Sequence, residues 1–153
     1  MRIVVQRVSR AVVRVEGEVV GEIGRGAVVL LGIGAGDDEA LADRMADKLA
    51  GLRYFADADG RTNLTLADAG GSFLVISQFT LYADLRRGRR PGFTDAAVPD
   101  VAAALVDRFV ARLRLLGHEV ATGRFGAMMD VELVNDGPFT LALDSARDLG
   151  PNQ

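Results

Sequence analysis

The chain has 153 residues, the size of one domain whose core is large enough to be stable without disulfides or a structural metal. Hydrophobic residues make up 49% of the sequence and charged residues 25%, which is typical of a globular protein. The formal net charge of -3 argues against a protein that binds nucleic acid through a basic surface over the whole molecule. The sequence has no cysteine, no signal peptide pattern and no run of about 20 apolar residues, so we expect a cytoplasmic protein without disulfides or membrane spans.

Strands are predicted at the start of the chain. Residues 2–8 and 11–23 alternate between apolar and polar side chains, with a hairpin turn at the Glu-Gly-Glu of residues 16–18. Residues 26–34 are almost continuously apolar, as in a buried strand. This order predicts a β-meander.

A short amphipathic helix is predicted over residues 39–51. Leu41, Met45 and Leu49 recur at fourfold spacing, the aspartates at 37 and 38 precede the first turn as caps, and a glycine stands at the end.

The middle of the chain contains a predicted turn at residues 57–60, a long buried strand at residues 72–84 and a second helix. Pro99 and Asp100 open this helix, and Gly117 closes it. Its predicted inner stripe consists of Val101, Leu105, Phe109, Leu113 and Leu116.

Two further strands are predicted at residues 128–134 and 138–144, separated by the turn-rich residues 135–137. The resulting order predicts a single α+β domain, with a mainly antiparallel sheet or open barrel and two principal helices. We place the domain at residues 1–145 and a polar C-terminal tail at residues 146–153, with fraying expected after Leu143.

The sequence gives little indication of a histidine-based catalytic triad, a nucleotide-binding loop or a metal site. His118 is the only histidine, and it follows the end of the predicted helix, where a surface or capping role is the simpler interpretation. The Gly-Ile-Gly-Ala-Gly of residues 32–36 lacks the full dinucleotide fingerprint and the P-loop lysine, which favours a tight turn. We therefore expect neither a metal site nor a cofactor.

Polar residues interrupt the apolar run of the predicted strand at residues 72–84. Strand alternation would place Ser77 and Phe79 on one face, and Gln78 and Thr80 on the other. Two interpretations stay open. These polar side chains could form hydrogen bonds with the neighbouring backbone, or they could line a polar pocket.

Gly137 and Pro138 stand inside an otherwise strand-like segment. Proline removes a hydrogen-bond donor and glycine weakens a strand, so a sheet admits this pair only at an edge, at a bulge or where the backbone approaches something closely.

Four arginines, Arg86, Arg87, Arg89 and Arg90, fall within five positions. Such a cluster can contact phosphate locally on an otherwise acidic protein, and a solvated loop is the alternative.

These segments together resemble the D-aminoacyl-tRNA deacylases over residues 1 to 143. The resemblance is carried by SQFTL and NDGPFT, together with GRGAVVLLGIG, RRPGF and TGRFGAMM, in the same order along the chain. It implies a homodimer that hydrolyses the ester between a D-amino acid, or glycine, and the 3′-terminal adenosine of tRNA, without a metal or cofactor.

The resemblance also implies roles for individual residues. The Gly137-Pro138 bond would be cis and would enter the pocket of the other subunit, where its carbonyl oxygens exclude L side chains. Arg7 would steady this inserted loop across the interface. Main-chain N–H groups around Gln78 and Phe79 would form an oxyanion hole, with Ser77 and Thr80 shaping the pocket. Phe125 and Met129 would line the adenosine pocket. Phe139 departs from the family, since the usual residue after Gly-Pro is smaller.

Three alternatives stay open. Thr80 could act as a covalent nucleophile in place of a mechanism assisted by the 2′-hydroxyl of the terminal ribose, although no general base is evident nearby. The chain could be a non-catalytic module that binds nucleic acid. It could also be the related deacylase type with a trans Gly-Pro bond, which is more permissive toward L-alanyl esters, although an arginine at position 7 favours the cis type.

Overall fold

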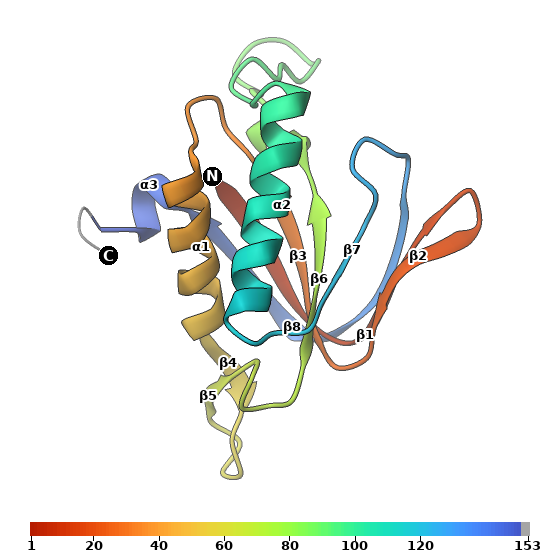
Figure 1. The fold of residues 1–153 in the computed structure, drawn as a ribbon, viewed down its shortest axis with the longest axis vertical. Helices are drawn as coiled ribbons and strands as arrows, with labels where there is room; N and C mark the ends of the chain where they lie inside the picture. The colour runs from red at the N-terminus through yellow and green to blue at the C-terminus, as the bar shows by residue number, and fades with distance from the viewer. Residues whose placement is uncertain (151–153) are drawn as a thin grey trace.

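The computed structural model describes residues 1–150, in which two helices lie side by side over one face of a curved sheet (Figure 1). In chain order the elements are β1 (Arg2–Val15), β2 (Glu18–Ile23), β3 (Gly26–Gly32), α1 (Glu39–Gly51), β4 (Arg53–Ala56), β5 (Thr62–Thr65), β6 (Ser72–Ser77), the 3-10 helix η1 (Phe79–Tyr82), α2 (Pro99–Leu115), β7 (Val120–Thr122), β8 (Asp130–Asp144) and α3 (Ser145–Asp148).

The main sheet is mixed and nearly closed on itself. β1 pairs antiparallel with β2, β3 and β8, whereas β6 pairs in parallel with both β3 and β7. β2 and β7 approach each other at Gly21, where a Cβ atom would overlap the carbonyl group of Thr122, so only glycine permits this approach. The predicted single α+β domain with an open barrel is confirmed, and the parallel pairs are an addition to it.

The central strands are buried on both faces, which explains why their sequences are almost continuously apolar. Val29 of β3 and Phe73 of β6 belong to the main core beneath α1 and α2. Leu30 and Leu74, the next residues along the two strands, pack in a second cluster inside the barrel.

Both predicted helices are present. α1 has the predicted bounds, and the side chain of Asp38 caps it by accepting a hydrogen bond from the N–H of Leu41 at 2.8 Å. Asp37 does not cap the helix, because its carboxylate instead accepts hydrogen bonds from the Met1 ammonium group and the N–H of Gly34. No helix among residues 1–150 is long and apolar enough to cross a membrane.

The predicted inner stripe of α2 is correct only at its centre. Leu105, Phe109 and Leu113 are buried, whereas Val101 and Leu116 are exposed. The buried face continues instead through the smaller residues Ala102, Val106 and Val110.

The prediction of one long strand over residues 72–84 is wrong. β6 ends at Ser77, and the chain turns into η1. This turn lies directly on β3 at Gly32, where a Cβ atom would stand 3.0 Å from the carbonyl oxygen of Gln78 and 3.0 Å from Cβ of Leu81. The expected alternation of side chains from residue 77 to 80 therefore does not apply, because it requires extended backbone.

The two strands predicted near the C-terminus form one strand, β8. Gln6 of β1 pairs with Thr140 and Val8 pairs with Asn135, so two steps along β1 correspond to five along β8. Residues 136–139 accordingly bulge out of the ladder, and the peptide bond between residues 137 and 138 in this bulge is cis. β8 pairs only with β1 among the described residues, so the Gly-Pro pair lies at a bulge of an edge strand, where sheets tolerate it.

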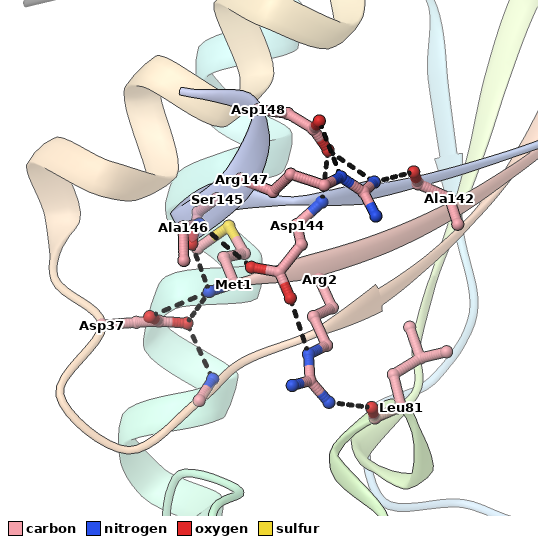
Figure 2. A network of polar contacts seen from close by, with 11 residues as sticks. Met1, Arg2, Asp37, Leu81, Ala142, Asp144, Ser145, Ala146, Arg147 and Asp148 are labelled. Carbon is pink, nitrogen blue, oxygen red and sulfur yellow. Dashed lines mark hydrogen bonds and ion pairs between the residues drawn. The ribbon is translucent and has the colours of Figure 1, made fainter. Parts of the chain in front are cut away.

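The segment after β8 is ordered where fraying was expected. The carboxylate of Asp144 caps α3 by accepting a hydrogen bond from the N–H of Ala146 at 3.0 Å, and Leu149 is buried. The hydroxyl of Ser145 accepts a hydrogen bond from the Met1 ammonium group at 2.9 Å (Figure 2). The expectation of fraying is therefore wrong up to residue 149, and residues 151–153 of the predicted tail lie outside the described residues.

Candidate active site

A cavity of about 470 Å³ lies where the ends of β3 and β6 meet the first turns of α2. Ser77 is the last residue of β6, and it shares a strand face with Val75 of the main core, so it faces α2 rather than the inside of the barrel. The lining residues are mostly apolar and comprise Leu31, Ile33, Ser77, Gln78, Phe79, Phe93, Ala96, Ala97, Val98, Pro99, Ala102, Val106, Phe125 and Gly126.

The turn from Ser77 to Thr80 supplies hydrogen-bond donors at this cavity. The N–H of Gln78 is already used, because it donates to the carbonyl oxygen of Leu31 at 2.8 Å. Phe79 and Thr80 begin η1, so their N–H groups have no acceptor within the helix, and none elsewhere in residues 1–150. The available main-chain donors are therefore those of Phe79 and Thr80, one position beyond the predicted pair.

The side chains of the turn also contact each other. The amide nitrogen of Gln78 donates a hydrogen bond to the hydroxyl oxygen of Thr80. Ser77 and Gln78 are half-buried and line the cavity, whereas Thr80 is exposed and lies outside the lining. The sequence left open whether these side chains bond to neighbouring backbone or line a polar pocket. Their placement fits the second interpretation, since Ser77 and Gln78 form a polar edge of the cavity.

Aromatic rings stand around the cavity. Phe79 meets Phe93 edge-on, with ring centroids 4.9 Å apart, and Phe125 lies on the wall. Partly exposed rings of this kind suit a flat ligand such as a nucleobase. Met129 does not line the cavity. Its sulfur lies against Gly123, and its side chain packs on the second core cluster.

Titratable groups are scarce at this site. None of the residues that line the cavity in the described chain carries a titratable side chain, although an adjoining cleft of about 60 Å³ includes Asp107 beside Ser77. His118 packs edge-on against Phe73, with ring centroids 5.1 Å apart, and burial lowers its pKa. No group of three or more histidine, aspartate or glutamate side chains within residues 1–150 could hold a metal ion. Hydrogen bonding is thus the chemistry that this cavity offers.

Arg7 holds the bulge of β8 from within the same chain. Its Nε donates to the carbonyl oxygen of Asp136 at 2.9 Å, and its Nη1 donates to the carbonyl oxygen of Tyr54 at 2.7 Å. Its guanidinium carbon lies 4.6 Å from the centroid of the Phe139 ring. Arg7 therefore contacts the residues on both sides of the Gly-Pro pair of its own chain. The contact across the interface that the resemblance implies for Arg7 stays a prediction.

Asn135 supports the bulge from the other side. Its amide nitrogen donates to the carbonyl oxygens of Arg7 at 2.8 Å and Phe139 at 3.1 Å. A Cβ atom on Gly137 would collide with the Asn135 side chain, so this position requires glycine. Gly137 and Pro138 are exposed and do not line the cavity of their own chain. The structure does not bring the Gly-Pro pair and the Ser77–Thr80 turn together within one chain.

The arginine cluster lies in the segment between η1 and α2, which also carries Phe93 into the cavity. Arg86 is paired with Asp84, with Nε and Nη2 at 2.8 and 2.9 Å from the two carboxylate oxygens. This bonding lowers the pKa of Asp84 to about 2. Arg87, Arg89 and Arg90 are exposed and have no acidic partner among the described residues.

Nothing in the sequence pattern pointed to two parts of this site. The first is the wall made by Phe93, by residues 96–99, and by Ala102 and Val106 of α2. The one feature of the sequence that could have indicated this wall was Phe93, an aromatic residue in a segment of small and charged residues. The second is Asn135, which the pattern assigned to a turn.

A family model and several named relatives match nearly the whole chain. The family model described as D-Tyr-tRNA(Tyr) deacylase matches residues 4–144. A protein of Roseiflexus sp. (strain RS-1) named D-aminoacyl-tRNA deacylase is 65% identical over 146 residues, which are 95% of this chain and 94% of the relative. A protein of the same name from Symbiobacterium thermophilum is 60% identical over 147 residues, which are 96% of this chain and 97% of the relative.

Two solved structures are also similar. One, of a protein named c-Myc DNA Unwinding Element Binding Protein, has a TM-score of 0.89 and 38% sequence identity, and the match covers 95% of this chain and 99% of that chain. The other, of a probable eukaryotic D-amino acid tRNA deacylase, has a TM-score of 0.82 and 20% identity over 93% of this chain and 97% of that chain. The second match concerns the fold alone.

Proposed function

The chain belongs to the D-Tyr-tRNA(Tyr) deacylase family, and from that premise we propose that it hydrolyses the ester bond between a D-amino acid and the 3′-terminal adenosine of tRNA. The observation that carries the proposal is the cavity beside the Ser77–Thr80 turn. It combines unpaired main-chain N–H groups with exposed aromatic rings, and its lining carries no titratable side chain in the described chain.

The chemistry that we propose matches these groups. An aminoacyl ester is already activated, so its hydrolysis depends more on orientation and on stabilisation of the oxyanion than on an acid and base pair. Water adds to the ester carbonyl and gives up one proton, and the N–H groups of Phe79 and Thr80 donate to the resulting oxyanion. Collapse breaks the bond to the ribose 3′-oxygen, which takes up the proton that the water gave up. The vicinal 2′-hydroxyl positions the water. One oxyanion donor is worth about 100-fold to 1,000-fold in kcat.

Thr80 as a covalent nucleophile is the rival mechanism. Its hydroxyl oxygen accepts a hydrogen bond from the Gln78 amide, a group that cannot remove the hydroxyl proton. We therefore expect Thr80→Ala to keep hydrolysis within about tenfold of the unmodified enzyme, and tRNA ending in 2′-deoxyadenosine to be the poorer substrate. Single-turnover deacylation of both substrates by both proteins checks this. Loss of activity in Thr80→Ala with normal hydrolysis of the 2′-deoxy ester would reverse the ranking.

Selection of the D-enantiomer is proposed to come from Gly137-Pro138 of a second copy of the chain. In this homodimer the two main-chain carbonyl oxygens of the pair face the substrate α-carbon and collide with an L side chain, whereas a D side chain or the hydrogen of glycine clears them. The pair is exposed, held by Arg7 and Asn135, and absent from the lining of its own cavity. A second chain is therefore needed to deliver it. The long free edge of β8 bears the exposed residues Val131 and Val134, which offer apolar surface for such contact.

The tRNA 3′ end is proposed to enter between the aromatic wall and the arginine segment. Phe125 is the candidate to stack on the terminal adenine, because it lines the cavity and the residue is 42% exposed. Arg87, Arg89 and Arg90 are the candidates to contact phosphate, since Arg86 is already occupied by Asp84.

Paired deacylation of D-Tyr-tRNA and L-Tyr-tRNA tests the proposal. We expect the D-ester to be hydrolysed faster by a factor of about 100 or more, and glycyl-tRNA to be hydrolysed as well. Equal rates for the two tyrosyl esters would contradict the chiral filter. Failure to hydrolyse any of the three esters would contradict the deacylase activity itself.

A non-catalytic module that binds nucleic acid is the second candidate. The exposed arginines favour it, and so does the more similar of the two solved structures, whose name is that of a protein that binds a DNA element. A chain that binds tRNA but leaves every ester intact would establish it. Rapid hydrolysis of L-Ala-tRNA would instead indicate the more permissive type of deacylase.

A further inference from the structure

The helix η1 has few interactions of its own to hold it in place. It is a single 3-10 turn of four residues, Gln78 at its start provides no side-chain cap to its backbone, and none of its residues is buried. A turn of this length is not stable alone. The orientation of its first N–H groups, those of Phe79 and Thr80, therefore depends on neighbouring elements.

Arg2 of β1 holds the far end of η1 (Figure 2). Its Nη1 donates a hydrogen bond to the carbonyl oxygen of Leu81 at 2.9 Å. Its guanidinium carbon also lies 4.5 Å from the centroid of the Tyr82 ring. One planar group thus contacts two successive residues of a four-residue helix.

Asp144 fixes the guanidinium group of Arg2. The Nε of Arg2 lies 3.0 Å from a carboxylate oxygen of Asp144. The other oxygen of that carboxylate accepts the N–H of Ala146 at 3.0 Å, and the N–H of Asp144 donates to Asp148 at 2.8 Å. The carboxylate is therefore itself fixed at the start of α3, as Figure 2 shows.

The position of Arg2 in the sheet aligns these contacts. Its backbone pairs with Gly32 on one side and with Asp144 on the other. Gly32 is the residue on which η1 rests, since a Cβ atom there would stand 3.0 Å from Cβ of Leu81. Arg2 thus lies between Gly32, on which η1 rests, and Asp144 at the end of β8.

We propose that Arg2 is a positioning residue for the hydrolysis, which holds the Leu81 carbonyl so that the N–H groups of Phe79 and Thr80 face the ester. This inference rests on the proposed function of the turn. Arg2 does not line the cavity, so its loss should act on kcat rather than on KM. A merely structural role would lower the folded fraction and leave the kcat of the folded enzyme unchanged.

The test compares Arg2→Met, Arg2→Lys and Arg108→Met in steady-state deacylation of D-Tyr-tRNA, with the folded fraction measured by circular dichroism. Methionine keeps an apolar stem but removes every donor, and lysine can reach Leu81 or Asp144 but not both. Arg108 is the matched control, because it is paired with Asp43 and does not touch η1.

We expect Arg2→Met to lower kcat about tenfold with KM within about twofold, because small displacements of a catalytic group are costly. Arg2→Lys should recover part of kcat, and Arg108→Met should change neither constant. Normal kcat in folded Arg2→Met would overturn the inference.

Asp144→Asn provides an independent readout if Arg2→Met does not fold. It weakens the anchor of Arg2 but keeps an oxygen for the cap of α3, and we expect kcat to fall about threefold at constant KM. An unchanged kcat in Asp144→Asn would then overturn the inference. Lack of hydrolysis by the unmodified enzyme would overturn the proposed function and this inference with it, whereas an active enzyme with unaffected variants overturns this inference alone.

Discussion

Phe139 has a defined place among the residues that hold the β8 bulge. Its ring stacks on Tyr54, with centroids 6.0 Å apart and planes inclined by 18°, and it supports the guanidinium of Arg7. The hydroxyl of Tyr54 is buried without a partner among the described residues, and burial raises its pKa. A large ring at position 139 therefore completes the packing around Arg7 instead of displacing it.

Replacing Phe139 with leucine should destabilise the fold by about 1 kcal/mol, because it removes a cation–π contact and an aromatic pair while keeping most of the apolar volume. Urea denaturation followed by circular dichroism measures the change. Phe125→Leu is the matched control, since Phe125 stands at the cavity and contacts neither Arg7 nor Tyr54. Equal midpoints for Phe139→Leu and the unmodified protein would show that the ring contributes nothing to the bulge.

At the scale of elements, the sequence predicts what local periodicity determines. The bounds of α1 follow from apolar residues at fourfold spacing and from Asp38 as its cap, and the structure has the same bounds. The end of β6 is not determined locally. Phe79, Leu81 and Tyr82 continue the apolar run, and the strand stops because η1 rests on Gly32 of another strand.

The candidate site could likewise be predicted only where its residues stand out in the local sequence. Ser77 and Gln78 could be identified as polar residues in an apolar run, and both line the cavity. The wall opposite comes from α2, and its residues Ala102 and Val106 are small apolar residues that look like ordinary core. Which face of α2 is buried depends on how the helix packs on α1 and the sheet. The apolar stripe predicted from the sequence included Val101, which is exposed, and so it did not identify the buried face.

Ion pairs between α1 and α2 give a prediction for stability against pH. Arg108 donates hydrogen bonds to both carboxylate oxygens of Asp43, and this bonding holds the pKa of Asp43 below its ordinary value of 3.8. A carboxylate whose pKa is lower in the folded protein stabilises the fold above the unfolded pKa and loses that contribution as the pH falls through the folded pKa.

Asp43→Asn should therefore lower Tm by about 1–3 °C near neutral pH, a small effect because Arg108 is 46% exposed and solvent screens the pair. The difference from the unmodified protein should shrink once the pH falls below 3.8 and disappear below the lowered pKa. Thermal unfolding at a series of pH values checks both parts. A difference that persists unchanged in acid would show that the lost ion pair is not its cause.

At the scale of the whole molecule, the two features that define the proposed activity lie apart. The cavity is at the ends of β3 and β6, near the N-terminal end of α2, whereas the Gly-Pro bulge lies on β8 opposite Arg7. Arg7 in turn pairs with Ala27, near the start of β3, so the bulge and the cavity stand toward opposite ends of that strand. Single-chain geometry thus favours delivery of the bulge by a second chain.

A mixed dimer can test which chain supplies the bulge. Gly137→Ala should disturb the bulge, because the new Cβ atom displaces Asn135, and we expect this variant to hydrolyse L-Tyr-tRNA. A second variant, Phe79→Pro, removes one proposed oxyanion donor and should lose about 100-fold in kcat. Each homodimer then lacks one of the two functions.

Co-expression of the two variants with different affinity tags, followed by purification on both tags, isolates the mixed dimer. If the bulge acts across the interface, the intact turn of the Gly137→Ala chain faces the intact bulge of the Phe79→Pro chain. Its single working site should then hydrolyse D-Tyr-tRNA and reject L-Tyr-tRNA, by a factor of about 100. If the bulge serves its own chain, the same mixed dimer keeps hydrolysing the L-ester at half the rate of the Gly137→Ala homodimer, and delivery by the second chain is excluded.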